Sequence, residues 1–373
     1  MRTTVVPKSF SAWLQSSFSG MRRRVWSRWA VTYVMGLILL IRFRSVSEIG
    51  RRMAKGAVDA LHHFIHDSPW DIKYMEEAQQ REIMRRTAGG ADKVRLVIDD
   101  TPVERCGPHI EGLGVHHSAK GLVKGLCAVT AVVSVAGWIW CWAVRGYRPK
   151  RTCAKGEFRS KVDLAVEILE SAVALGSDVT ALMDSWYACR RILNRVAIQG
   201  WRYVAAIKAN RRIYVDDRST TVRHLAKGKR KYFTVRLSKK RKVHVAGRIA
   251  ELPGVGPVAV FITKTKGKTK FLISNDLSLS PEAAVRLYAE RFRIETFHRD
   301  VKQHLGFGEL WVRSWQAVQK HWTLCSLAYN ALQNWNASQH SRHRTFGTVI
   351  RAFRDKFLLF SAKEWYYDFP VAA

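Results

Sequence analysis

The chain has 373 residues, of which 47% are hydrophobic and 11% aromatic, so it is long and apolar enough for two or three folded domains and is not a disordered protein. Its 63 Lys and Arg against 30 Asp and Glu give a formal net charge of +33. Self-repulsion at that charge destabilises a compact chain, so a polyanionic partner is expected. Nucleic acid is the first candidate, and an anionic membrane surface is its competitor. The six cysteines include no Cys-x2-Cys pair, which favours reduced cytosolic thiols over disulfides or a zinc site.

Residues 1 to about 90 are expected to be helical. The stretch TYVMGLILL is apolar, and the segments RSVSEIGRRM and VDALHHFIHDSPWD carry apolar residues at helical spacing. Basic clusters at 22–24 and 51–52 suit contact with nucleic acid. We predict a helical N-terminal DNA-binding domain over 1–90.

From about residue 94 the periodicity changes to that of strands. The run VRLVIDD at 94–100 predicts a buried strand whose carboxyl end opens onto a site. Residues 126–144 carry no charge over 19 positions, a length just inside the threshold for a transmembrane helix. Their content of Val, Ile and Trp, with Gly137 in the middle, favours two buried strands joined by a tight turn. We therefore expect no membrane association.

Further elements complete an α/β pattern over 91–210. A helix is expected at about 159–175, followed by a strand that ends at Asp184 and runs into a second helix. The stretch WRYVAAIKAN predicts one more strand. The order β-β-β-α-β-α-β places acids at strand ends, where ligands tend to bind in α/β folds. We predict that 91–210 forms the first part of a catalytic core.

Residues 211–273 interrupt that layout with short β-rich runs separated by glycine and basic turns, which predicts a β-rich insertion domain. Nine Lys or Arg and no acid lie between Lys227 and Lys242 inclusive. A solvated, charged sheet is the alternative explanation of this run. Given the charge of the whole chain, we expect it to contact a phosphate backbone, through Lys229, Arg230, Lys231, Lys239, Lys240 and Arg241.

The segment YAERFRIETFHRDVK at 288–302 is the most informative part of the chain. Arg291, Glu295 and Lys302 follow Tyr288 by 3, 7 and 14 residues, offsets that fall within about 60° around an α-helix. One helix face would therefore carry a phenol, a carboxylate and two cations. A solvated helix with i,i+4 charge pairs is the alternative for this segment taken alone.

The flanking residues predict where this helix lies. Ser280 and Pro281 suit its N-cap and first helical position, and Gly306 suits its end. The amphipathic stretch that follows, at 312–335, should close the core. We predict that 274–345 is the remainder of the catalytic core and that 346–373 is a basic C-terminal segment.

Three isolated acids share a chemical logic in this layout. Asp99, or its neighbour Asp100, ends one strand, Asp184 ends another, and Glu295 lies on the later helix. Converging carboxylates repel one another unless cations neutralise them, and hard oxygen ligands favour Mg²⁺ or Mn²⁺. Two such ions would activate a water or a 3′-hydroxyl and stabilise the leaving oxygen in phosphodiester chemistry.

With its last acid inside Tyr-x2-Arg-x3-Glu-x6-Lys, the chain resembles the DDE transposases of bacterial insertion sequences that carry the YREK signature. IDDTP at 98–102 resembles the first-acid strand of that family, and MDSWYACRRIL at 183–193 resembles its second-acid strand and helix. The stretch 272–309 is similar to its third-acid region throughout. The resemblance implies an RNase H-like catalytic core, interrupted by the β-rich insertion domain and preceded by the helical domain.

The resemblance also implies roles for single residues. The three acids would coordinate two metal ions, and Asp99 is favoured over Asp100 because Asp99 and Thr101 match the family's Asp-x-Thr pattern. Relatives can place a tryptophan in the insertion domain to stack a flipped base, but this chain has none between Trp201 and Trp311. The remaining signature residues would grip the DNA phosphates and terminal nucleotides: Tyr288, Arg291 and Lys302.

The implied function is cut-and-paste DNA transposition. The protein would bind the terminal inverted repeats of its element in double-stranded DNA, cleave there, and join the freed 3′-hydroxyl to target DNA. The resemblance implies a homodimer in a synaptic complex, in the bacterial cytoplasm and associated with the nucleoid. Two alternatives stand beside it: an RNase H-like nuclease that cuts without joining, and a non-catalytic, domesticated DNA-binding protein.

Overall fold

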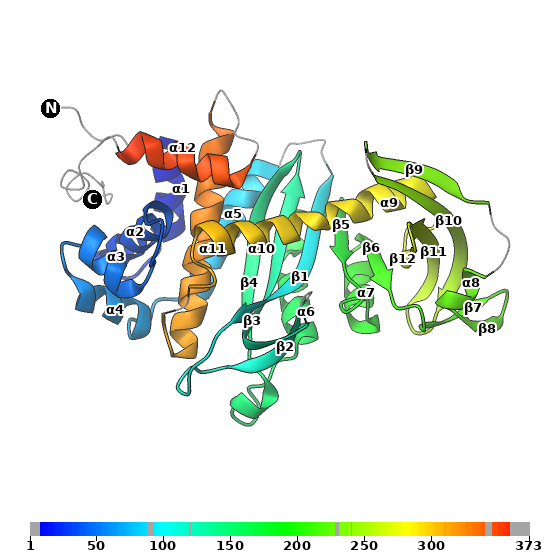
Figure 1. Cartoon of the computed structure of the whole chain (residues 1–373), viewed down its shortest axis with the longest axis horizontal. Coiled ribbons are helices and arrows are strands. Elements are labelled where there is room, and N and C mark those ends of the chain that lie inside the picture. Colours follow the sequence, from blue (N-terminus) through cyan, green and yellow to red (C-terminus); the bar gives the residue numbers. More distant parts are fainter. Residues whose placement is uncertain are drawn as a thin grey trace.

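The computed structural model describes residues 8–87, 93–118, 121–227, 231–239, 241–309, 311–339 and 345–358. Helices and strands form a mixed α/β arrangement around one large sheet (Figure 1). Within these ranges, five helices precede the first strand: α1 Lys8–Phe18, α2 Arg24–Leu39, α3 Val46–Met53, α4 Val58–His66 and α5 Ile72–Thr87.

The described residues contain twelve strands, and all of them belong to one sheet. Their bounds are β1 Val94–Glu104, β2 Gly114–Ser118, β3 Gly121–Val135, β4 Trp138–Tyr147, β5 Val179–Met183, β6 Arg202–Ile207, β7 Arg212–Val215, β8 Arg218–Thr221, β9 Phe233–Ser238, β10 Arg241–Leu252, β11 Gly256–Thr265 and β12 Lys268–Ser274. The remaining helices are α6 Lys161–Ser171, α7 Arg190–Ile198, α8 Val222–Leu225, α9 Pro281–Glu290, α10 Phe292–His304, α11 Trp315–Ala337 and α12 Phe346–Leu358, with short 3-10 turns η1 Lys150–Thr152 and η2 Val173–Leu175.

The strands lie in the order β2-β3-β1-β5-β6-β12-β11-β10-β7-β8, with β4 beside β3 and β9 beside β10. Strand β5 is parallel to both β1 and β6, and the other pairs are antiparallel. Parallel neighbours need crossover connections, which α6 and α7 provide.

The sheet differs from the sequence-based expectation at β1. This strand does not end at the paired acids: it continues to Glu104, because β3 pairs with it that far, to Glu104 opposite Gly125. The periodicity also missed β2, which pairs with the start of β3.

The β-rich insert continues the sheet of the core strands. Its last strand, β12, pairs with β6, with Phe271 opposite Ile207. Hydrogen bonding is therefore unbroken from the core strands into the insert. The domain boundaries at 211 and 273 stay predictions.

The uncharged run at 126–144 forms two antiparallel strands, β3 and β4, as predicted. The chain turns at Ala136 and Gly137, whose φ angles are 49° and 82°; positive φ at both positions is the requirement of a type I′ hairpin turn. The Val, Ile and Trp side chains of the run are mostly buried. Across the described ranges, every helix is too short or too polar to span a lipid bilayer.

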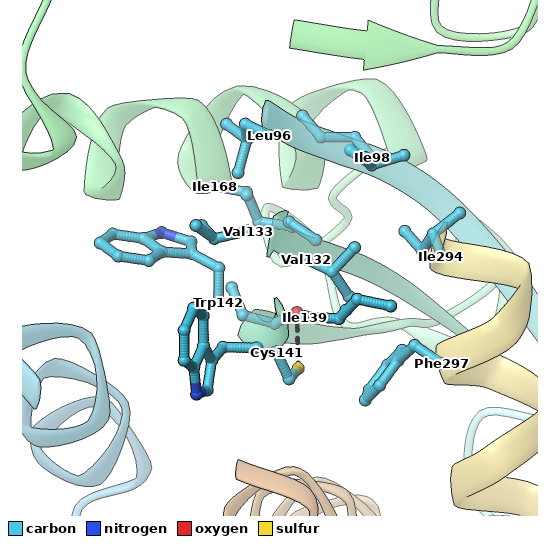
Figure 2. Packing of buried hydrophobic residues seen from close by; sticks show 14 of the residues in the cluster. Leu96, Ile98, Val132, Val133, Ile139, Cys141, Trp142, Ile168, Ile294 and Phe297 are labelled. Atoms are coloured by element: carbon cyan, nitrogen blue, oxygen red, sulfur yellow. Dashed lines mark hydrogen bonds between the residues drawn. The ribbon is translucent and has the colours of Figure 1, made fainter. Parts of the chain in front are cut away.

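The core lies on both faces of the central strands. In Figure 2, Leu96 and Val133 lie toward Ile168 of α6, whereas Val132 lies toward Ile294 of α10. All five side chains are fully buried. Successive strand residues point to opposite faces, so α6 and α10 cover opposite sides of β1 and β3.

The single helix predicted through the signature segment is two helices in line. The first, α9, begins as predicted, with Ser280 as its N-cap and Pro281 at its first position. The chain tightens at Arg291, whose N–H donates to the carbonyl of Tyr288, three residues back. Helix α10 follows at once and packs across β1 and β3 (Figure 1). It ends before Gly306, whose φ of 71° suits a helix end, also as predicted.

The N-terminal helices pack on α11 and not as a separate body (Figure 1). The guanidinium of Arg44 is buried and pairs at 2.6 Å with Glu309, just beyond α10. Arg354 of α12 donates over 2.6 Å to the carbonyl of Ile38 in α2. Residues 8–87 are therefore helical as expected, and the DNA-binding role of 1–90 stays a prediction.

His321 of α11 is buried and joins two distant segments. Its Nε2 lies 3.0 Å from the carbonyl of Gly306, which can only accept, so Nε2 donates and Nδ1 accepts the Tyr33 hydroxyl at 2.8 Å. Burial lowers the pKa of His321 to about 4. Between that pKa and the unfolded value near 6.5, the unfolded chain binds a proton that the folded chain does not. Stability from this group is therefore present above about pH 6.5 and is lost as the pH falls toward 4.

We predict that His321→Gln makes folding less sensitive to acid. Each pH unit below about 6.5 costs the wild type about 1.4 kcal/mol through this group, so from about pH 7.5 to 5 the wild type should lose about 2 kcal/mol more unfolding free energy than the variant. Urea denaturation at the two pH values measures the difference. The exposed His109 provides the control, and His109→Gln should keep the wild-type response. Equal acid losses in His321→Gln and wild type would contradict the assignment.

Candidate active site

The carboxyl ends of the parallel strands β1, β5 and β6 meet at one edge of the sheet. The parallel pairing of β1 with β5 stops at Ile98 opposite Met183. Asp99 and Asp184 directly follow these two paired residues, so the register of the two strands alone brings both acids to this edge. Asp99 follows the end of the parallel pairing but not the end of the strand, since β1 continues against β3.

Arg291 links two of the three acids. Its guanidinium donates to Asp99 Oδ2 over 2.8 Å and also pairs with the carboxylate of Glu295. Only 18% of the Asp99 side chain and 17% of the Arg291 side chain are exposed. Burial raises the pKa of Asp99 to about 7, an effect that Arg291 opposes and the nearby Asp184 carboxylate strengthens. Two of the three acids therefore pair with one partly buried guanidinium, and the third, Asp184, lies near Asp99.

The other two signature residues lie on the same side of β1. The Tyr288 ring centroid is 5.8 Å from Cζ of Arg291, and burial raises the pKa of Tyr288, so its hydroxyl stays protonated. Lys302 Nζ donates to Thr101 Oγ1 at 2.6 Å and to the carbonyl of Pro102 at 2.7 Å. Both of these bonds tie α10 to β1, although the resemblance implied a DNA contact for Lys302.

Asp184 opens the loop between β5 and α7. Its Oδ1 accepts the N–H of Trp186 at 2.9 Å and that of Tyr187 at 3.3 Å, the pattern of an Asx turn. These bonds fix the orientation of the carboxylate on a short loop. Within the described part of the chain, its other oxygen accepts no hydrogen bond.

Asp100 lies on the face of β1 opposite to Asp99, because neighbouring strand residues alternate. It pairs with Lys161 of α6 at 2.5 Å and accepts the Cys127 thiol at 3.3 Å and the Tyr187 hydroxyl at 3.1 Å. The two candidates for the first acid therefore have different surroundings. Asp99 faces the Arg291 and Glu295 side, and Asp100 faces α6.

The basic run lies on a different part of the sheet from the acids. Lys231, Lys239 and Arg241 are exposed, at the ends of β9 and β10. In the sheet, β10 is separated from β1 by β5, β6, β12 and β11. The other three predicted DNA contacts lie outside the described residues: Lys229, Arg230 and Lys240.

Sequence reasoning missed Trp186. Among the tryptophans that the structure describes, only Trp186 and Trp311 are exposed, at 55% and 57%. Trp186 lies two residues beyond Asp184, and Nζ of Lys208, the residue after β6, is 5.5 Å from its ring centroid. The position of Trp186, two residues after the second acid, was a usable signal, whereas the resemblance directed attention to a stacking aromatic in the insert.

Comparison with known protein families assigns the chain to one of them. A family model described as DDE superfamily endonuclease matches residues 16–247. The chain belongs to this family. The matched stretch contains Asp99 and Asp184 and ends before Glu295.

A curated relative extends the comparison. The chain is 23% identical over 209 residues to a protein from Microchaete diplosiphon named a probable transposase for insertion sequence element IS701. The alignment covers 54% of this chain and 53% of the relative. The chain thus spans about half the length of the curated relative it matches.

DDE superfamily endonucleases generally depend on divalent metal ions, and the donor chemistry of the edge fits such an ion. Within the described ranges, no three His, Cys, Asp or Glu side chains are arranged as a ready metal cluster. Asp99 and Glu295 nevertheless already converge on one positive group, the Arg291 guanidinium. The raised pKa of Asp99 marks a buried carboxylate that further positive charge would stabilise.

We predict that Lys302→Met lowers the free energy of unfolding by about 1–3 kcal/mol, because the buried Thr101 hydroxyl and the Pro102 carbonyl lose their shared donor. Gln303 is exposed on the same helix, and Gln303→Met should change it by less than about 0.5 kcal/mol. Urea denaturation of the two variants beside wild type measures both effects. An equal, small effect of the two substitutions would show that the Lys302 bonds do not hold α10 to β1.

Proposed function

We propose that this protein is a DDE transposase of an insertion sequence, which binds the terminal inverted repeats of its element, cleaves the DNA there and joins the freed 3′ ends to target DNA. One observation carries the proposal: Asp99 and Glu295, far apart in the sequence, contact the same guanidinium beside Asp184. Family membership supports phosphodiester cleavage, and the name of the relative supports transposition. The net charge of +33 supports double-stranded DNA as the partner.

We infer an RNase H-like core built on β4-β3-β1-β5-β6. In this unit β3 runs antiparallel to its neighbours and β5 lies parallel to both β1 and β6. The β-rich insert follows β6, and α9 and α10 return across the sheet to place Arg291 between Glu295 and Asp99. The insert and the N-terminal helices, 1–90, act as the DNA-binding parts around this core.

The three acids hold the cations, which we take to be two Mg²⁺ ions with Mn²⁺ as a substitute. When bound, such ions activate the attacking oxygen and stabilise the leaving oxygen of a phosphodiester. Asp99 is held by the strand ladder and Asp184 by its turn, so these ligands need little rearrangement during the reaction.

The signature residues orient the DNA strand. The planar guanidinium of Arg291 offers paired N–H donors that match a phosphate as well as a carboxylate. Tyr288, protonated because its pKa is raised, donates a hydrogen bond to a phosphate oxygen. Lys302 positions Asp99 through its bonds to Thr101 and Pro102 on the same strand.

Other contacts with DNA come from exposed residues. Trp186 offers an aromatic face beside Asp184, where a base can stack, and Lys208 adds a positive charge there. The basic run supplies contact with the phosphate backbone that is independent of sequence. The protein acts as a homodimer on paired element ends, in the bacterial cytoplasm at the nucleoid.

We predict that Glu295→Gln abolishes excision and joining of an element carried on a plasmid with the gene's own flanking DNA, by at least about 100-fold. Glu290 provides a matched control, because both side chains are 40% exposed, and Glu290→Gln should stay within about threefold of wild type. Asp184→Asn and Asp99→Asn should behave like Glu295→Gln. Asp178→Asn, at the opposite end of β5 from Asp184, should retain wild-type excision and joining.

The same assay separates the alternatives. Chelation with EDTA should abolish the products, and Mg²⁺ or Mn²⁺ should restore them. Nicked DNA without joined products would identify a nuclease. DNA binding without any cleavage by wild type would identify a non-catalytic protein, and equal activity of wild type and Glu295→Gln would refute the assignment of the third acid.

We predict that replacing Lys231, Lys239 and Arg241 with Gln weakens binding to duplex DNA and reduces its salt dependence. Each lost phosphate contact lowers the slope of log K against log salt by about 0.9, so the slope should fall by about 2 to 3. Fluorescence anisotropy over a range of salt concentrations measures it. The control replaces three exposed lysines of the β11–β12 hairpin, Lys266, Lys268 and Lys270. Identical slopes for the two triple variants would refute a specific role of the basic run.

A further inference from the structure

Three side chains on the α6 side of β1 form a polar cluster, beside the Cys127 thiol that also donates to Asp100: Asp100, Lys161 and Tyr187. Nζ of Lys161 is 2.5 Å from Asp100 Oδ2, and the Tyr187 hydroxyl donates to Asp100 Oδ1 over 3.1 Å. Asp100 and Lys161 are 16% and 17% exposed, and Tyr187 is fully buried. We call these three residues the Asp100 network. The reaction proposed above uses none of them.

Tyr187 belongs to the loop that carries Asp184. Its N–H donates to Asp184 Oδ1 while its hydroxyl reaches Asp100. One residue therefore contacts both the second acid and the immediate chain neighbour of Asp99. Burial and the carboxylates of Asp100 and Asp99 raise the pKa of Tyr187 well above its ordinary value, so the phenol remains a hydrogen-bond donor.

The two partners of Tyr187 in this network stand on rigid elements. Asp100 lies in the strand ladder opposite Val129 of β3. Lys161 is the first residue of α6, whose start is fixed by a capping box of Ser160 and Asp163. The loop, by contrast, has left the parallel ladder, because the pairing of β1 with β5 ends at Met183. Tyr187 therefore links this loop to β1.

We propose that the Asp100 network sets the separation of Asp99 and Asp184, so that Asp100, Lys161 and Tyr187 are positioning residues for cation binding. The inference rests on the proposed function, in which those two acids hold the cations. It also explains why two acids stand side by side in IDDTP: Asp99 faces the reaction, and Asp100 faces the support that holds the other acid in place.

Tyr187→Phe tests the proposal, because it removes one hydroxyl and leaves the buried ring. The matched control is Tyr203→Phe on the neighbouring strand β6: Tyr203 is also fully buried, and its hydroxyl has no hydrogen-bond partner in the described part of the chain. Two readouts are needed. Hydrogen–deuterium exchange follows the backbone amides at 184–189, and the electron paramagnetic resonance signal of free Mn²⁺ measures Mn²⁺ binding by the protein without DNA.

We expect Tyr187→Phe to speed exchange of the loop amides about tenfold and to weaken Mn²⁺ binding about tenfold, the typical effect of losing a hydrogen bond to a charged acceptor. Tyr203→Phe should match wild type in both. Asp100→Asn keeps an acceptor oxygen and should retain more Mn²⁺ affinity than Asp100→Ala. Excess Mn²⁺ should restore DNA cleavage to Tyr187→Phe but not to Asp184→Asn.

Wild-type exchange and wild-type Mn²⁺ affinity in Tyr187→Phe would overturn the inference, as would equal losses in Tyr203→Phe. Faster exchange in Tyr187→Phe with unchanged Mn²⁺ affinity would show that the network only holds the loop in place. That result would also overturn its positioning role in cation binding. If wild type cleaves DNA in a way that needs Asp184 while Tyr187→Phe binds Mn²⁺ normally, only this inference fails. If Asp184→Asn binds Mn²⁺ as wild type does, the proposed function is refuted, and so is this inference, which rests on it.

Discussion

Strand β1 imposes the constraint on which the rest of the site depends. Because β3 and β5 hold its two edges, its side chains can point only to the two faces of the sheet, and successive residues alternate. Asp99 and Thr101 therefore meet Arg291 and Lys302 on one face, while Asp100 meets α6 on the other. A one-residue shift of register would exchange these environments, which is why both edges of the strand matter for the chemistry.

Pairing with positive charge allows the acidic side chains of the site to lie close together. A carboxylate as buried as Asp99 is costly to ionise, and its pKa near 7 expresses that cost. Arg291 offsets part of it by pairing with Asp99 and Glu295 together. Among the described residues, most Lys and Arg lie elsewhere and are exposed, where they suit a long polyanion. In the proposed function, the acidic edge and the basic surface thus suit different parts of one substrate, the reacting bond and the flanking backbone.

Local patterns in the sequence predicted the local structure well. The β3–β4 hairpin followed from its apolar run with Gly137, and the start of α9 followed from Ser280 and Pro281. Three features could not be predicted, because each depends on partners distant in sequence. Strand β1 continues past its acids because β3 pairs with it there. The signature helix tightens at Arg291, whose side chain contacts Asp99. Asp100 lies on the opposite face of β1 and pairs with Lys161. Spacing along one helix could predict that the signature residues share a face. It could not show that Lys302 donates its hydrogen bonds to β1.

The central claim is that Asp99, Asp184 and Glu295 hold a divalent cation together, and Fe²⁺-directed cleavage of the polypeptide tests it most directly. With added hydrogen peroxide as oxidant and ascorbate as reductant, Fe²⁺ bound in place of Mg²⁺ generates hydroxyl radicals that cut the chain next to the bound ion, and peptide mapping locates the cuts. The account predicts cuts near all three acids in the same protein, suppressed by excess Mg²⁺ and absent in Asp184→Asn. Cuts confined to other segments, or cuts that Mg²⁺ does not suppress, would contradict it.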